Sequence, residues 1–401
     1  MNIKRRQFLN LTANVAAIGT LMTVMPGVSY ASLPTDRRFV LVVLRGGMDG
    51  LAAVPAYGDK DYKISRGDLA LDENQILNLD GYFGLHPSLK VLHRAYQKKQ
   101  AVIFHAIASP YRERSHFDGQ NILENGTDKA NGAHDGWLNR AISHVRGDTS
   151  KLGLAVGQGV PLVLYGQQSV ASWTPANFDV LTDSLIEQLE RLYINDPLLH
   201  QSLAQGLSIH EMADAAMKDM QGQKKRRKRQ NVKAMVEGAG KLLADENGAR
   251  IATIEIGGWD THAQQGLATG KLSKMFLSLG EGLDILSRTL EPVWHKTAIL
   301  VVTEFGRTVA ENGTKGSDHG TASAAFLLGG AVKGGQVISN WPGLSKKALY
   351  QGRDLKPTLD IRQIFKSVLN QHMGISLNAL ERDVFPNSQH VKPLKGVILK
   401  S

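Results

Sequence analysis

The chain has 401 residues, 42% of them hydrophobic and 21% charged, a composition typical of a globular enzyme and not of a low-complexity protein. It contains no cysteine, which excludes disulfide bonds. The formal net charge is +10, and six cations form one uninterrupted run at residues 224–229. Such a run could bind nucleic acid or anionic lipid, but no aromatic residue interleaves with it. A solvated loop or helix face is therefore the better interpretation, and we expect no nucleic-acid partner.

The first 31 residues have the pattern of an export signal. Arg5 and Arg6 precede a weakly apolar stretch at residues 11–28, and small residues end the segment at Ala31. The sequence KRRQFLN resembles a twin-arginine signal, which exports folded proteins. The apolar stretch is too short and too broken for a stable membrane span, and no other segment could form one. We expect a periplasmic or secreted mature protein, with the twin-arginine translocase as its partner during export.

Strands and helices alternate at the start of the expected mature domain, residues 32–401. Residues 39–44 (FVLVVL) are a continuous apolar run typical of a buried strand, and Asp49 follows in a glycine-rich turn. Taken alone, Asp49 is more simply interpreted as a turn former or a helix N-cap. A helix is predicted over residues 85–96 and a strand over residues 101–104.

Ser115 opens the next predicted helix, which runs to about Glu124. A serine there can cap the helix, and a serine at the positive end of a helix can also serve as a nucleophile. For Ser115 by itself the cap is the simpler interpretation. His116 and Asp118 beside it favour the alternative.

Residues 153–248 interrupt the alternation. They contain a short β-like piece at residues 161–164 and then amphipathic helical patterns at residues 181–193, 198–220 and 232–243. We interpret the segment as a largely helical insertion beside the sheet. The alternation then resumes, and the predicted elements are a strand at Ile251–Ile256, a helix at residues 271–294, strands at residues 298–303 and 324–328, and a helix at residues 361–373.

Polar side chains follow the ends of these later strands. They are Asp260 and His262, then Glu304 and Arg307, then Asp318 and His319 in the segment SDHG. Ligands of open α/β sheets bind beyond the carboxyl ends of the strands, so these groups are expected to converge with Asp49. Carboxylates and imidazoles together suggest a metal site. Glu304 and Arg307 could equally form a structural ion pair.

Several segments carry a resemblance to a known family. LRGGMDGL, HPSLKVLH, RERSHFDGQ, GWLNR, GGWDTHAQQG, TEFGRTVAENGTKGSDHG and GGAVKGGQV resemble, in order, the signature segments of domain of unknown function 1501. That family is usually placed in the alkaline phosphatase-like (sulfatase) superfamily. The resemblance implies an α/β fold, an alkaline phosphatase-like three-layer sandwich with a central, mostly parallel sheet.

The same resemblance assigns roles to residues. Asp49 matches the first metal-binding Asp, and Ser115 falls near the nucleophile. Asp260 and His262 resemble an Asp–His metal pair with a shorter spacing, and Glu304-Phe305 stands where the superfamily has Asp-His. Asp318 and His319 would supply the last ligand, or would themselves be the superfamily's Asp-His pair at a shifted position in the sequence.

The leading hypothesis is an exported metal-dependent hydrolase of phosphate or sulfate esters. The metal would be held by Asp49, Asp260, His262, Asp318 and His319, with Glu304 as a further ligand. Ser115 would be the nucleophile, and Arg45, Arg114 and Arg307 would bind the ester oxygens. Mixed nitrogen and oxygen ligands favour Zn or Mn, with Ca or Mg as alternatives. The competing hypothesis is a non-catalytic exported binding or assembly protein that keeps the fold, with a second exported protein of unknown function as its partner.

Overall fold

The computed structural model describes residues 35–145, 149, 152–157, 159–175 and 232–399. All of these residues belong to one compact unit, Pro34–Ser401. The expected export signal, the expected helices at residues 181–193 and 198–220, and the basic run at residues 224–229 lie outside the described residues. Among the described residues, no helix is both long enough and apolar enough to cross a membrane.

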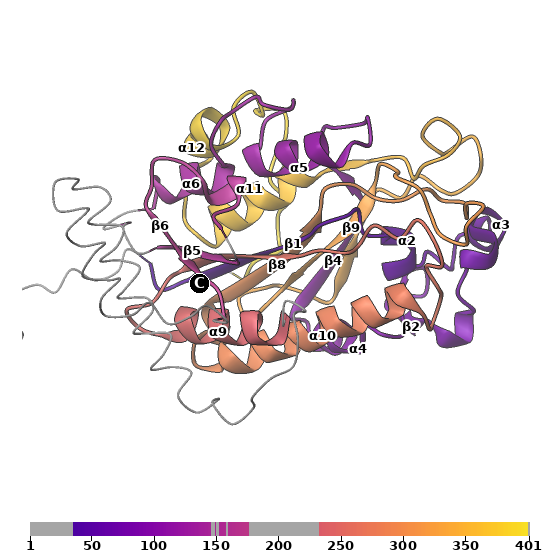
Figure 1. Ribbon diagram of the computed structural model, residues 1–401, viewed down its shortest axis with the longest axis horizontal. Coiled ribbons are helices and arrows are strands. Elements are labelled where there is room, and N and C mark those ends of the chain that lie inside the picture. The colour runs from indigo at the N-terminus through magenta and orange to yellow at the C-terminus, as the bar shows by residue number, and fades with distance from the viewer. Residues whose placement is uncertain (1–34, 146–148, 150–151, 158, 176–231, 400–401) are drawn as a thin grey trace, which may run out of the picture. The chain divides into compact units, whose positions relative to one another are not determined.

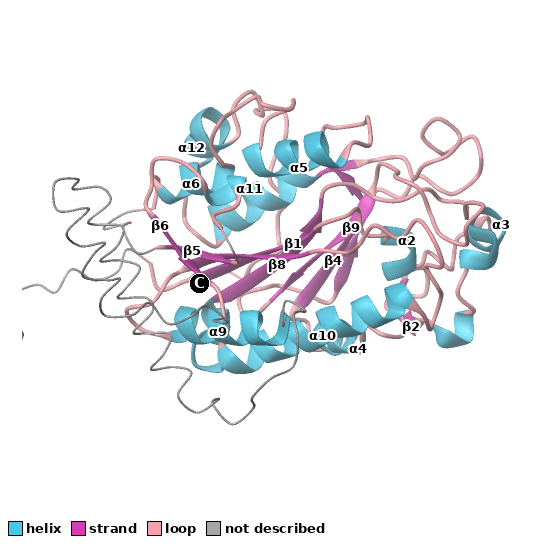
Figure 2. Cartoon of the chain, in the orientation of Figure 1, coloured by secondary structure: helices cyan, strands magenta, loops and turns pink. Residues whose placement is uncertain are grey.

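The described part of the chain is built on a mixed, mostly parallel sheet (Figure 2). Its strands run in the order β10-β4-β9-β8-β1-β7-β5-β6, and β11 pairs with β4. Only β9 runs antiparallel to its neighbours among these strands, β4 on one side and β8 on the other. The bounds are β1 Arg38–Leu44, β4 Ala101–Ala108, β5 Gly153–Val156, β6 Val170–Trp173, β7 Ile251–Ile256, β8 Thr297–Thr303, β9 Ser323–Leu328, β10 Gln336–Ile338 and β11 Leu359–Asp360; β2 Leu77–Asn78 and β3 Gly84–Leu85 form a separate pair.

Helices cover both faces of this sheet (Figure 1). The helices are α2 Gly50–Ala53, α3 Tyr62–Arg66, α4 Lys90–Gln97, α5 His116–Asn125, α6 Trp137–Ile142, α9 Val232–Ala244, α10 Lys271–Thr289, α11 Ile361–Gln371 and α12 Leu377–Ala379. Short helical turns lie at Gly67–Leu69, Glu73–Gln75, Leu162–Leu164, Glu291–Lys296 and Leu380–Val384. Helices α4, α9 and α10 lie on one face, and α5, α6, α11 and α12 on the other. The predicted α/β class with a central, mostly parallel sheet between helices is confirmed.

The central strand β1 shows why the sheet needs a helical layer on each face. Its side chains alternate between the faces: Val40 and Val42 pack in the core under α9 and α10, whereas Leu41 and Val43 pack in the core under α6 and α11. Every residue of β1 is buried, and after Arg38 its sequence is apolar without interruption instead of alternating. The continuous run FVLVVL is therefore a signature of a strand with two covered faces.

Three predicted boundaries are wrong. The helix expected to continue to residue 294 ends at Thr289, and a separate 3-10 turn follows at Glu291–Lys296. The helix expected from residue 85 begins at Lys90, because Leu85 pairs with Leu77 in the small β2–β3 sheet. The strand expected to end at Phe104 continues to Ala108, past the polar side chain of His105 and an irregularity at Ala106, where φ is 55°. His105 is fully buried, so its polarity does not mark the end of the strand.

The segment in which a helical insertion was expected begins inside the sheet. Gly153–Val156 and Val170–Trp173 are the strands β5 and β6, paired in parallel with each other. The β-like piece expected at residues 161–164 is wrong, because Leu162–Leu164 forms a single 3-10 turn after Pro161. The helix expected at residues 232–243 is confirmed as α9, which packs against β7 and α10.

Acid should destabilise the fold through buried neutral histidines. His105 is fully buried, its Nε2 lies 2.9 Å from the carbonyl oxygen of Val54, and burial lowers its pKa to about 4. The unfolded chain, with a pKa near 6.5, then binds more protons than the folded chain between pH 6.5 and 4, so stability falls as the pH falls. The upper limit for His105 is about 3 kcal/mol. His105→Gln keeps a donor for Val54 and cannot titrate. In urea unfolding between pH 7 and 4, the free energy of unfolding of the variant should therefore fall less steeply with pH than that of wild type. An equally steep fall would contradict the role of His105.

Candidate metal centre

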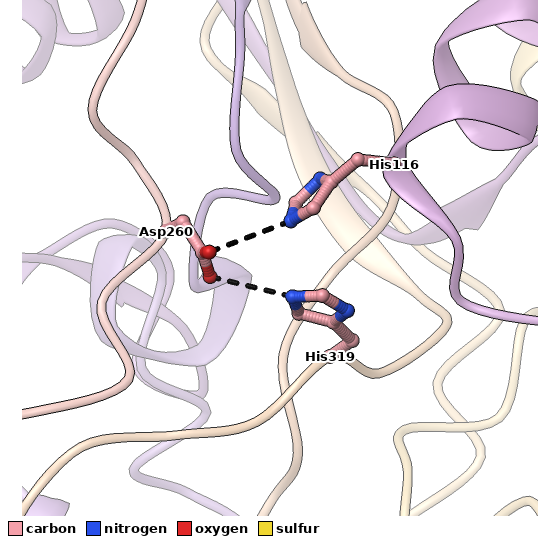
Figure 3. A group of neighbouring side chains, drawn as sticks. All are labelled: His116, Asp260 and His319. Carbon is pink, nitrogen blue, oxygen red and sulfur yellow. Dashed lines mark ion pairs between the residues drawn. The ribbon is translucent and has the colours of Figure 1, made fainter.

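The polar side chains beyond the strand ends come from four loops at one edge of the sheet. Glu304 follows β8, and Asp260 lies in the loop after β7. His116 is the first residue of α5, after β4. His319 lies before β9, and because β9 is antiparallel to β8, the start of β9 lies beside the end of β8. Figure 3 shows His116 and His319 pointing toward the carboxylate of Asp260.

His116, His319 and Asp260 form a cluster of candidate metal ligands among the described residues. One ligand atom from each lies within 4.8 Å of the others. His116 Nε2 is 3.6 Å from Asp260 Oδ2, and His319 Nε2 is 3.4 Å from Asp260 Oδ1. His116 Nε2 is buried and makes no hydrogen bond to any described residue. An imidazole nitrogen in this position needs either a proton or a cation to satisfy it.

The other ring nitrogen of each histidine is held by an acceptor. His116 Nδ1 lies 2.9 Å from Glu304 Oε1, and His319 Nδ1 lies 2.9 Å from the carbonyl oxygen of Arg114. We assign the proton of each neutral ring to Nδ1, which leaves a lone pair on Nε2 facing Asp260. The hydrogen bond to Glu304 raises the pKa of His116, whereas burial lowers the pKa of His319. Histidines that bind metals usually donate their other ring N–H to a carboxylate or to a backbone carbonyl oxygen in this way.

Asp260 is kept anionic by a buried guanidinium. Burial is the largest single influence and acts to raise its pKa, but the hydrogen bond from Arg307 Nη1 to Asp260 Oδ1, the charge of Arg307 and the two nearby imidazoles of His262 and His319 together lower the pKa. Arg307 is only 2% exposed, and Ser317 accepts from its other nitrogens through Oγ and the carbonyl oxygen. Each of the three Arg307 nitrogens thus has a protein partner. The contact with Asp260 orients the carboxylate.

His262 adds a third imidazole to the centre. Its Nε2 lies 3.0 Å from Asp260 Oδ1 and 3.0 Å from His319 Nε2. Its Nδ1 lies 3.0 Å from Asp318 Oδ1. The pKa of Asp318 is lowered, first by a hydrogen bond from Asn312 and then by His262. Asp318 therefore lies behind His262 in the same way that Glu304 lies behind His116.

Glu304 is buried and fully engaged. Its Oε1 accepts hydrogen bonds from the backbone N–H of Gly46 at 2.8 Å and from Gln120 at 3.1 Å, as well as from His116. Its Oε2 accepts from Thr303 at 2.9 Å. Burial is the largest single influence and acts to raise the pKa of Glu304, but the hydrogen bonds that the carboxylate accepts, led by that from His116, together lower the pKa. Glu304 is placed to orient His116 instead of facing the centre.

Asp49 is held away from the imidazole cluster by other partners. Its Oδ1 caps α2 through the N–H of Ala52 at 3.0 Å, and its Oδ2 accepts from Arg66 at 2.7 Å and from Gln265 at 2.7 Å. Asp49 and Arg66 are each no more than 1% exposed, so this is a buried ion pair. Gln265 in turn accepts a hydrogen bond from Ser317, the residue that holds Arg307. Asp49 thus reaches the centre only through intermediate side chains.

Ser115 precedes His116 at the N-terminus of α5. Its hydroxyl makes no capping hydrogen bond to the helix, and its backbone N–H donates to the hydroxyl of Tyr111 at 3.0 Å. The predicted N-cap position of Ser115 is therefore confirmed, but its side chain does not cap the helix. Ser115 is placed next to the ligand cluster with its hydroxyl uncommitted to the helix.

The arginines expected to bind ester oxygens are already paired with acids. Arg45 contacts Glu124 at 2.6 Å and also Glu255, and Arg114 Nε contacts Asp354 Oδ2 at 2.8 Å.

Two surface hollows lie elsewhere: one of about 480 Å³ is lined by His134 and Tyr165, and one of about 440 Å³ by His144 and Met373. Neither includes the candidate ligands.

His116 was not among the ligands expected from the sequence. The signal for it was present, because His116 directly follows Ser115 in RERSHFDGQ, but a spacing pattern could not show which way the ring points. Asp260, His262, Asp318 and His319 are brought together as expected, while Asp49 and Glu304 are engaged with other groups.

Comparison with known proteins gives a family but no activity. The sequence profile described as "Protein of unknown function (DUF1501)" matches residues 36–382. A search of curated proteins finds no match. Among solved structures, Ps i-CgsB in complex with k-i-k-neocarrahexaose is 12% identical, with 90% of this chain and 75% of that chain covered and a TM-score of 0.41. The C-terminal periplasmic domain of EcEptC from Escherichia coli, a Zn complex, is 9% identical (94% and 96% covered, TM-score 0.40), and the PsFucS1 sulfatase from Pseudoalteromonas sp. is 10% identical (90% and 70% covered, TM-score 0.39). Likenesses at this level carry no information on the activity of this chain.

Proposed function

Because this chain belongs to the DUF1501 family of proteins of unknown function, we propose its function from the site itself: an exported, metal-dependent hydrolase of phosphate or sulfate esters. The observation that carries the metal dependence is the convergence of His116 and His319 on Asp260, each ring held through Nδ1. The ester class rests on the resemblance of the signature segments to the sulfatase superfamily. Export rests on the pattern of residues 1–31.

The residues fit a divalent cation. His116, His319 and Asp260 would supply two nitrogens and one oxygen, and His262 stands close enough to add a third nitrogen. The unsatisfied, buried Nε2 of His116 is the kind of atom that a cation would engage. Nitrogen-rich sets with one carboxylate favour Zn or Mn, because Ca and Mg prefer oxygen ligands.

In this proposal the side chains around the centre divide the work. A bound cation would polarise the ester and neutralise charge on the transferred group. Ser115, at the positive end of α5, would attack the phosphorus or sulfur atom through its hydroxyl oxygen and lose its proton to solvent, while the ester P–O or S–O bond breaks and the alcohol leaves. Water would then release phosphate or sulfate and regenerate the hydroxyl of Ser115. Arg307 would keep Asp260 ionised and oriented, and Glu304 and Asp318 would hold His116 and His262.

One observation favours the second candidate, a non-catalytic exported binding or assembly protein. The guanidinium groups of Arg45, Arg114 and Arg307 are each paired with a carboxylate of the protein. None of these three is therefore presented to an anionic ester, and recognition of the ester would have to rest on the cation and on Ser115. A second exported protein would be the partner in this alternative.

The two candidates are separated by one series of measurements on purified protein. Metal content is measured first, and hydrolysis of generic phosphate monoesters, phosphate diesters and sulfate esters is then followed with Zn, Mn, Mg and Ca. The hydrolase proposal expects stoichiometric Zn or Mn and turnover that Ser115→Ala abolishes without loss of the metal. Stoichiometric metal without turnover of any ester class would favour the binding protein. A protein that neither contains nor takes up metal would contradict the metal-dependent proposal.

A further inference from the structure

Phe305 is in ring contact with both candidate ligand histidines. It follows Glu304 at the end of β8 and is only 4% exposed. Its ring centroid lies 4.8 Å from that of His116, with 31° between the ring planes. The centroid of His319 lies 5.3 Å away, with 44° between the planes. One aromatic side chain therefore packs against two imidazoles that come from loops some 200 residues apart in the sequence.

Two glycines let the backbone approach the Phe305 ring closely. A Cβ built on Gly47, in the turn after β1, would lie 2.9 Å from Phe305 Cε2. A Cβ built on Gly119, in α5, would lie 2.9 Å from Phe305 Cδ1. The backbone of each glycine thus approaches the ring where a side chain would collide with it. The close approach fixes the position of the ring relative to α5, the helix that carries His116.

A hydrogen bond at Nδ1 does not by itself fix an imidazole. The hydrogen bonds of His116 to Glu304 and of His319 to the carbonyl oxygen of Arg114 each tolerate some rotation of the ring about its Cβ–Cγ bond, because such a bond weakens steeply only when its angle falls below about 120°. Contact with a buried, immobile aromatic ring limits this rotation, because the imidazole plane cannot turn without losing packing. Metal ligands must be held to within about 0.5 Å and 10–20° for tight binding.

We propose that Phe305 is a positioning residue that sets the orientation of His116 and His319 toward a shared cation. The inference rests on the proposed metal centre and adds to it a residue that binds nothing itself. It also gives a reason for Gly119, where a Cβ would meet the ring, whereas Gly47 has in addition a φ of 70°, which favours glycine by itself.

Phe305→Leu tests the inference with Co(II) as the probe. The variant keeps an apolar side chain but removes the flat ring, so the Co(II) dissociation constant should rise about tenfold or more, the range of changes behind metal ligands. The visible absorption bands of bound Co(II), which report ligand geometry, should change as well. The matched control is Phe326→Leu in β9, a fully buried phenylalanine in the core of the same sheet. The control should lose stability in a similar way while keeping the wild-type Co(II) affinity and spectrum.

Gly119→Ala is a second test, which can be used if Phe305→Leu does not fold. The added methyl group would press on the Phe305 ring from α5. Alanine favours the helical conformation of α5, but its Cβ must displace Phe305. We expect Co(II) binding weaker by about threefold or more, with no loss of apo-protein stability beyond that of the displaced ring. Wild-type affinity and spectrum in both Phe305→Leu and Gly119→Ala would overturn the inference and leave the metal centre standing. Wild-type protein that binds neither Co(II) nor Zn would overturn the metal centre itself.

Discussion

Asp260→Asn is expected to weaken the binding of a divalent cation about 100-fold or more. The substitution keeps size and hydrogen-bonding capacity but removes the charge toward which His116 and His319 converge. At a metal concentration 100 times its dissociation constant, wild-type protein should gain about 2.7 kcal/mol of stability by mass action. At the same concentration the variant would gain about 0.4 kcal/mol. Isothermal titration gives the dissociation constants, and thermal unfolding with and without metal gives the gains.

The matched control for Asp260→Asn is Asp72→Asn. Asp72 is exposed and makes no capping hydrogen bond, so it tests the chemical change without the site. Asp260→Asn also loosens Arg307, so the apo variant should be less stable than apo wild type, and the comparison is made on the gain from metal. An equal gain in wild type, Asp260→Asn and Asp72→Asn would remove Asp260 from the centre.

The strands of the sheet centre could be predicted because both faces of the sheet are covered. β1, β8 and β9 are buried at every residue, and each contains a continuous apolar run of at least five residues that marks it in the sequence. β5 and β6 could not be found in this way. They are four residues long, and β6 is largely half-exposed at the end of the strand order, so it has no apolar run to mark it. The direction of β9 is likewise set by pairing, which periodicity does not encode.

The candidate site could be predicted as a neighbourhood but not as a set of contacts. Polar residues after β7 and β8 had to meet at the carboxyl edge of the sheet, and Asp260, His262, Asp318 and His319 do so. Which groups face the centre depends on side-chain partners that the sequence does not pair. Asp49 meets Arg66, which comes from a stretch without a clear pattern, and Glu304 meets His116 across 188 residues of chain. These partners hold Asp49 and Glu304 behind the centre.

Arg66→Met is expected to destabilise the protein by about 3–5 kcal/mol, the range for breaking a buried ion pair. Arg66 and Asp49 are at most 1% exposed, and without the guanidinium the Asp49 carboxylate keeps only Gln265 and the N–H of Ala52 as partners. Arg66 also donates to the carbonyl oxygen of Val309 at 2.9 Å. The pKa of Asp49, now lowered by Arg66 against the effect of burial, should rise in the variant. The loss of stability should therefore be smaller at acidic pH, where the carboxyl can take up a proton.

The control for Arg66→Met is Arg362→Met. Arg362 also pairs with an aspartate that caps a helix, Asp360, but this ion pair is more exposed to solvent. Asp360 caps α11 as Asp49 caps α2, and Arg362 NH2 lies 2.7 Å from its Oδ2, but the Asp360 side chain is 25% exposed. Arg362→Met should cost about 1 kcal/mol of stability or less, because water can replace the lost partner.

The double variant Asp49→Asn with Arg66→Met removes both charges and keeps a side chain that can cap α2, so it should recover part of the stability lost in Arg66→Met. Urea unfolding of the four proteins at pH 7 measures these differences. The metal dissociation constant of the double variant also decides the role of Asp49. If it stays within about threefold of the wild-type value, Asp49 is a structural residue. If it rises about 100-fold, as expected for the loss of a ligand, Asp49 belongs to the metal centre.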